Sequence, residues 1–247
     1  MSKTETFPAR TVVTSFLSCE ETLLSVLRIV PWCAAHENVW SPVLTTVIME
    51  SCSQLDSLWR HTAWLSPCVR EKKKRKDDLN MRDYFRYFAG KSLTPLGKRW
   101  VVLWGGEDPV QICPYNAWDG ADTYKALPWW QAYNNLKHDR LANRESATLR
   151  AAVNATAGLF LAILQSDHCR YAVAASDLLS SSDAVAHNPL ALLGEDSLSV
   201  KDGYVLAESR LFSYPVGWCA ADIKAADVWR GNASMRFKHW FFGHSTE

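Results

Sequence analysis

Four polar side chains with complementary chemistry lie within one short segment: Asn134, Lys137, His138 and Arg140. On an α-helix each residue turns the chain by about 100°, so the first three share one face. If the helix continues as far as Arg140, this residue lies about 60° from Lys137, at the edge of that face. Lysine and arginine bring positive charge, asparagine brings directed hydrogen bonds, and histidine exchanges protons near neutral pH. The spacing therefore predicts a site for a phosphate or another anion, with His138 available for acid–base chemistry.

A purely structural interpretation of these four residues stays open. Cations in the last turn of a helix interact favourably with the helix dipole. A buried polar network that fixes the register between helices has the same sequence pattern. In that case acidic side chains of other helices would enclose the cluster, and the possible partners are Glu20, Glu21, Asp56 and Asp83.

The charge run at residues 70–78 is a second candidate site. Its basic side chains are Lys72, Lys73, Lys74, Arg75 and Lys76. Such a run is typical of a solvated loop between helices. The functional interpretation is an electrostatic contact with a nucleic-acid backbone, whose affinity would fall steeply with salt.

Apolar residues at spacings of three and four predict the helices that must position these groups. Ser18 with Glu21 forms a capping-box pattern and predicts a first helix from about residue 18, preceded by a loose or strand-like arm over residues 1–15. Ser41-Pro42 predicts the start of a long helix over 42–65. Further helices are expected at about 80–89, from Pro128 through the candidate cluster, and over about 145–165.

A change of pattern after residue 98 predicts a β-hairpin. Two β-like segments, 99–104 and 110–113, flank the turn Gly-Gly-Glu-Asp-Pro. The expected fold is therefore mainly α: a helical bundle over 1–168 with a hairpin insertion at about 98–114. An irregular C-terminal extension, 169–247, is expected to pack on the bundle, with strand at about 204–212 and a long loop at 181–202.

Composition excludes several classes of protein. The 247 residues carry a net charge of +1, so nucleic-acid or membrane binding would need a local patch. Seven cysteines without a C-x-x-C pair favour free thiols in a reducing compartment over disulfides or a metal site. The sequence lacks a secretory signal, a membrane-length apolar segment, a P-loop and a dinucleotide-binding glycine motif, so we expect a cytoplasmic protein without a cofactor. The twelve tryptophans are expected to pack in the core, with a stacking or partner-binding surface as the alternative.

The segment from Pro128 to Arg140, Pro-Trp-Trp-Gln-Ala-Tyr-Asn-Asn-Leu-Lys-His-Asp-Arg, resembles a motif of uncharacterised bacterial HEPN-like proteins (higher eukaryotes and prokaryotes nucleotide-binding). In them a "YNxxKHxR" helix precedes a long packed helix, as Ala147-Thr-Leu and the alanine-rich stretch do here. Residues 36–59 resemble an earlier helix of such proteins. The resemblance covers about residues 16–165.

This resemblance implies a helical bundle, often dimeric, from a prokaryotic antiviral defence or toxin-type system that cleaves RNA or binds RNA or a nucleotide without a metal. By that analogy His138 would act as acid or base, Lys137 and Arg140 would stabilise the scissile phosphate, and Asn134 would orient one of them. The usual R-x4-H motif is absent, because no arginine has a histidine five positions later. The alternative is a catalytically inactive interaction or scaffold subunit with a protein partner.

Overall fold

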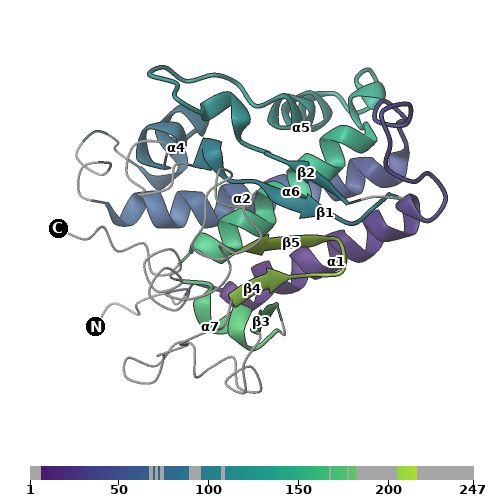
Figure 1. Ribbon diagram of the computed structural model, residues 1–247. Helices are drawn as coiled ribbons and strands as arrows, with labels where there is room; N and C mark the ends of the chain where they lie inside the picture. Colours follow the sequence, from purple (N-terminus) through teal and green to yellow (C-terminus); the bar gives the residue numbers. More distant parts are fainter. Residues whose placement is uncertain are drawn as a thin grey trace.

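A computed structural model describes residues 7–66, 69, 72, 75–88, 96–106, 109–166, 168–176, 178–181 and 205–215 (Figure 1). The protein is mainly helical, as predicted, with a small antiparallel sheet. The helices are α1 (Ala9–Leu27), α2 (Pro42–Leu65), α4 (Met81–Phe88), α5 (Pro128–His138), α6 (Leu149–Gln165) and α7 (Arg170–Ala174). The strands are β1 (Val101–Leu103), β2 (Val110–Ile112), β3 (Leu179–Ser181), β4 (Val205–Glu208) and β5 (Phe212–Pro215).

Local capping explains where the long helices begin. The Ser41 side chain accepts a hydrogen bond from the Val43 amide at 3.2 Å, and Pro42 is the first residue of α2, which confirms the predicted helix over 42–65. The Thr148 side chain accepts from the Ala151 amide at the start of α6, a few residues after the expected boundary.

The expected start of the first helix near residue 18 is wrong. Helix α1 begins at Ala9, and both residues of the supposed capping box, Ser18 and Glu21, lie inside it. The backbone carbonyl of Ser18 instead accepts a bond from the Thr22 hydroxyl at 2.9 Å. The reason is that Val12, Val13 and Phe16 are buried in the core, and this tertiary packing extends the helix upstream of the local pattern.

Helix α6 forms the centre of the molecule. It packs against α1, α2 and α5, and nearly all of its residues are buried, which confirms the prediction of a core helix (Figure 1). Gly158 permits a close approach on one side, because a Cβ there would lie 3.1 Å from the Tyr115 hydroxyl and 3.2 Å from the Trp129 ring. The Tyr115 hydroxyl also donates to the Gly158 carbonyl at 2.7 Å.

The predicted hairpin is confirmed as β1 and β2, with Val101 opposite Ile112. It belongs to a five-stranded sheet in the order β2-β1-β5-β4-β3, in which Leu103 of β1 pairs with Phe212 of β5. The strand expected at about 204–212 is present as β4, which pairs with β5. The Phe212 ring stacks on Phe160 of α6 with centroids 5.9 Å apart, so this part of the sheet rests on the helical core. Residues 182–204 and 216–247, which include most of the predicted loop and the end of the extension, lie outside the described residues.

Tryptophan packing supplies much of the core between α2, α4 and α5. The Trp59 ring lies within 5.7 Å, centroid to centroid, of Tyr84, Phe88, Tyr115 and Trp118. The packing interpretation therefore holds for the buried tryptophans Trp59, Trp118, Trp129 and Trp130, whereas Trp40 and Trp104 are exposed. None of the helices in the described part of the chain is both long enough and apolar enough to span a membrane.

Candidate functional site

The candidate cluster lies at the C-terminal end of α5. Helix α5 buries Trp129, Trp130, Tyr133 and Leu136 against the core, because these apolar residues recur at helical spacing. Asn134, Lys137 and His138 are exposed on the remaining surface of the helix. Arg140 is exposed too, but it follows the helix, which ends at His138 and has Asp139 as its C-cap.

An ordered turn holds Arg140 beside the helix end. The Asn143 side-chain amide donates to the carbonyls of Asn135, at 3.3 Å, and Asp139, at 2.8 Å. The Asp139 carboxylate in turn accepts from the Ala142 amide at 3.0 Å. This turn therefore supplies hydrogen-bond partners for backbone carbonyls that the end of a helix leaves without them. The carboxylate of Asp139, the acid nearest to the cluster in the chain, is engaged within the same turn.

The possible acidic partners are engaged elsewhere. Glu20 is buried and accepts from the Leu211 amide at 2.9 Å. Glu21 forms an ion pair with Arg210. These residues face the C-terminal strands, because they lie on the side of α1 that meets the 209–212 turn.

Asp56 lies in a separate polar group between α2 and α4. It forms an ion pair with Arg60 and accepts from the Tyr84 hydroxyl at 2.8 Å. Arg60 also reaches Asp77 at 3.3 Å. Asp83, the fourth acid considered, accepts from the Asn80 amide at 3.1 Å. None of these acids pairs with the α5 cluster within the described ranges.

The cluster therefore presents its cationic groups to solvent. Among the residues that the structure describes, Lys137, His138 and Arg140 form no ion pair. The Lys137 ammonium lies 5.5 Å from the centroid of the Tyr133 ring, a cation–π distance. Burial raises the pKa of the Tyr133 phenol, and Cys52 and Asp56 raise it further, so this hydroxyl stays protonated at neutral pH.

The basic run is separate from this cluster. It follows the C-terminal end of α2, a helix of 24 residues that is about 36 Å long at about 1.5 Å per residue. Lys72 and Arg75 are exposed, Arg75 pairs with Asp78 at 3.3 Å, and the Lys76 ammonium lies 3.5 Å from Nδ1 of His61. Lys73 and Lys74 lie outside the described residues.

Two residues that the sequence did not single out extend the α5 cluster. Arg144, in a short 3-10 turn after α5, places its guanidinium carbon 5.5 Å from the centroid of the exposed Trp40 ring. Neither residue has a sequence signal for this contact, because helical periodicity ends before Arg144 and Trp40 precedes α2, far away in the chain.

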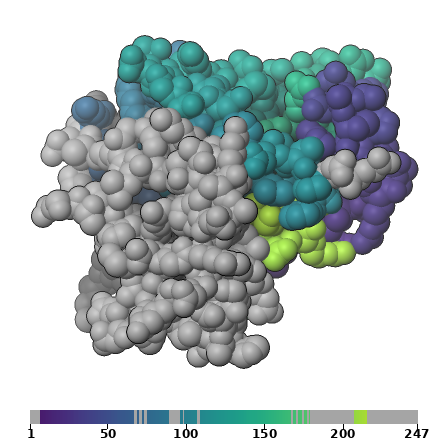
Figure 2. Space-filling view, in the orientation of Figure 1, coloured from purple at the N-terminus to yellow at the C-terminus, as the bar shows by residue number. Residues whose placement is uncertain are grey.

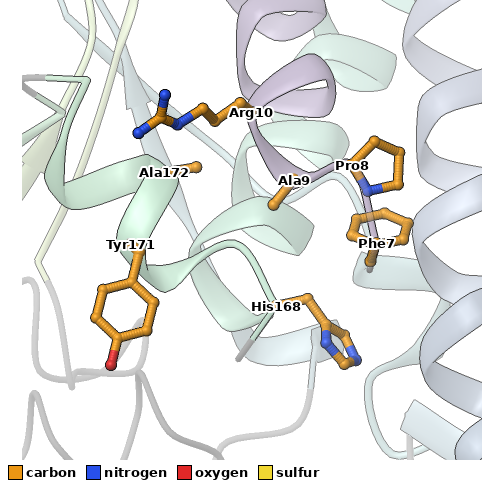
Figure 3. Close-up of a pocket in the computed structure, with 7 residues that line it drawn as sticks. All are labelled: Phe7, Pro8, Ala9, Arg10, His168, Tyr171 and Ala172. Carbon is orange, nitrogen blue, oxygen red and sulfur yellow. The ribbon is translucent and has the colours of Figure 1, made fainter. Parts of the chain in front are cut away.

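A pocket lies at the other side of the helical core, between the start of α1 and helix α7 (Figure 3). Its volume is about 420 Å³, and Arg10, His168 and Tyr171 are its polar lining residues. The His168 and His61 rings meet edge to face with centroids 4.8 Å apart. No group of three metal-binding side chains occurs in the part of the chain that the structure describes.

The sequence matches no family model, no curated protein and no solved structure at significant similarity. The HEPN-like resemblance of residues 128–140 therefore remains a hypothesis.

Proposed function

We propose that the protein binds RNA through the C-terminal end of α5, as a HEPN-like component of a prokaryotic defence or toxin-type system. One observation carries the proposal: Lys137, His138 and Arg140 are all exposed. The candidate acidic partners Glu20, Glu21 and Asp56 contact other residues. Two permanent cations with an adjacent imidazole and the Asn134 amide suit the charge and the hydrogen-bond acceptors of a phosphodiester backbone.

The polarity of the helix opposes an anion here only weakly. A helix C-terminus carries a partial charge of about −0.5. The Asn143 amide already binds the carbonyls of Asn135 and Asp139, so these carbonyls are partly screened from a ligand. The full positive charges of Lys137 and Arg140 outweigh the remaining partial charge.

Binding and cleavage make different demands on this surface. Binding needs only exposed donors and positive charge. Cleavage needs a group that takes a proton from the ribose hydroxyl, and His138 is the residue of the cluster with that chemistry. The HEPN-like resemblance supports His138 in this role, with no metal required.

The experiment is a titration of a short fluorescent single-stranded RNA in EDTA, followed by anisotropy at about 50 and about 200 mM salt. We expect salt-sensitive binding that the double variant Lys137→Ala/Arg140→Ala weakens roughly tenfold or more, with a shallower salt dependence. The matched control is Arg28→Ala/Arg86→Ala, which removes the same charge from two exposed positions, the C-cap of α1 and helix α4. Equal losses in both variants, or an RNA that does not bind at low salt, would refute the proposal.

The same RNA, incubated with the protein in EDTA and separated by size, tests the catalytic part. His138→Ala is expected to abolish cleavage while the variant still binds the RNA in the anisotropy titration, with at most a small loss of affinity, and keeps the helical circular dichroism of wild type. Intact RNA after prolonged incubation with wild-type protein would restrict the function to binding.

A further inference from the structure

Trp40 is one of two exposed tryptophans among the nine that the structure describes, whereas the other seven are buried or partly buried. Its side chain is 41% exposed, and the neighbouring Val39 and Val43 are also exposed, at 37% and 44%. Exposed apolar side chains that gather in one place are a feature of binding sites. The Arg144 guanidinium carbon lies over the Trp40 ring, 5.5 Å from its centroid, so one face of the ring carries a cation and the patch is positively charged on that side.

Backbone hydrogen bonds hold Trp40 in place. Trp40 and Thr148 form an isolated antiparallel bridge, and the Leu149 amide donates to the Val39 carbonyl at 2.8 Å. The Arg150 amide donates to the Glu37 carbonyl at 2.9 Å. The segment 37–41 is thus fixed along the start of α6, and an aromatic ring on it needs little ordering when a ligand binds.

A continuous ordered segment joins this platform to the α5 cluster. Asn143, which ties down the end of α5, directly precedes Arg144, which contacts Trp40. Figure 2 shows the purple segment that precedes α2 against the green segment that follows α5. Three acids lie nearby: Glu37 is paired with Arg150, Asp139 accepts from the Ala142 amide, and Glu145 is exposed. The surface therefore combines cations at one end with an aromatic ring and a further cation at the other.

We infer that Trp40 is a stacking platform for a nucleobase, so that the RNA bound at this surface is unpaired. This inference rests on the proposed function and names its substrate class. Every base has an apolar face that stacks on an aromatic ring, but a base in a duplex is already stacked between its neighbours and cannot reach Trp40. Arg144 is placed to contact the phosphate beside the stacked base, and Lys137 and Arg140 contact the backbone further along.

The test compares three fluorescent ligands of equal length by anisotropy: a single-stranded RNA, an abasic ribose-phosphate strand, and an RNA duplex. Stacking on one aromatic side chain changes affinity by about fivefold to 100-fold. Trp40→Ala is therefore expected to weaken binding of the single-stranded RNA by such a factor and to leave binding of the abasic strand unchanged. Trp40→Phe, which keeps an aromatic face, should restore most of the affinity. The matched control is Trp104→Ala, which removes another exposed tryptophan, 51% accessible and on the sheet side of the molecule.

The outcomes separate this inference from the proposed function. Binding that Lys137→Ala/Arg140→Ala weakens but Trp40→Ala does not would overturn the stacking platform and leave the cationic site standing. A Trp40→Ala variant that loses the abasic strand equally would show that the ring acts through the fold, which also overturns it. Binding of none of the three ligands would overturn both proposals, and the patch would then be assigned to a protein partner.

Discussion

Glu20 links the first helix to the last described strands, and its removal tests how the sheet is attached to the core. The side chain is 1% exposed and accepts the Leu211 amide hydrogen bond at 2.9 Å. Glu20→Ala leaves that buried amide without an acceptor and opens a cavity. Loss of this hydrogen bond, with the Leu211 amide left buried and unpaired, is expected to lower the free energy of unfolding by about 2 to 4 kcal/mol.

For a chain of this length each kcal/mol lowers the melting temperature by about 2 to 4 °C. We therefore expect Glu20→Ala to melt roughly 4 to 16 °C below wild type in a circular-dichroism or calorimetric scan. Glu20→Gln keeps an oxygen acceptor in the same place and should lose only about 1 kcal/mol. The adjacent Glu21→Ala is the matched control, because its ion pair with Arg210 is more than half exposed and contributes little.

Hydrogen exchange gives an independent reading of the same bond. The Leu211 amide should exchange slowly in wild type and in Glu20→Gln, and quickly in Glu20→Ala. A Glu20→Gln variant as unstable as Glu20→Ala, or a control that melts as early as Glu20→Ala, would refute the assignment of the stability to this hydrogen bond.

Three further predictions concern backbone packing, thiol reactivity and the pH dependence of stability. Gly97→Ala should lower the free energy of unfolding by at least about 1 to 3 kcal/mol in chemical denaturation, because its Cβ would overlap the backbone at Asp119; an unchanged denaturation midpoint would contradict that contact. Burial raises the pKa of Cys113 and of Cys169 from 9.0 to about 12, so at about pH 8 a thiol reagent should label the exposed Cys33 well before either of them, as peptide mass spectrometry would report. The folded state holds these protons more tightly than the unfolded state, so their contribution to stability is complete below pH 9 and declines as the pH rises from 9 toward 12. Denaturation at about pH 8 and about pH 10 checks the sign, and a smaller decline in Cys169→Ala than in wild type is the expected control.

The sequence predicted correctly those helices whose position depends on residues close together in the chain. The cap Ser41 followed by Pro42 fixed the start of α2, and periodic burial identified α6 as a core helix. The predicted start of α1 was wrong because Val12, Val13 and Phe16 are buried in the core. Such tertiary contacts cannot be inferred from a capping pattern. The pairing of β1 with β5 could not be predicted either, since short strands carry no information about distant partners.

For the candidate site, helical spacing predicted correctly that Asn134, Lys137 and His138 lie on one helix, but not what faces them. Whether Glu20 or Asp56 neutralises a cation depends on how α1 and α2 are rotated against the rest of the core. That rotation is a tertiary property, and it directs Glu20 toward Leu211 and Asp56 toward Tyr84. Helical periodicity also gave no reason to place Trp40 near Arg144, because each of the two residues lies in a connection between α-helices.

The position of β1 inside the sheet, between β2 and β5, affects the order in which the sheet can form during synthesis on the ribosome. Its partner β2 follows within a few residues, but its other neighbour, β5, is synthesised about a hundred residues later. Until Phe212 and Ser213 emerge, one side of β1 has unsatisfied amides and carbonyls that favour pairing with strands of other nascent chains. A chain whose synthesis stops after the helices are complete would therefore expose the unpaired edge of β1, which favours aggregation, even though the residues of the helical core are already present.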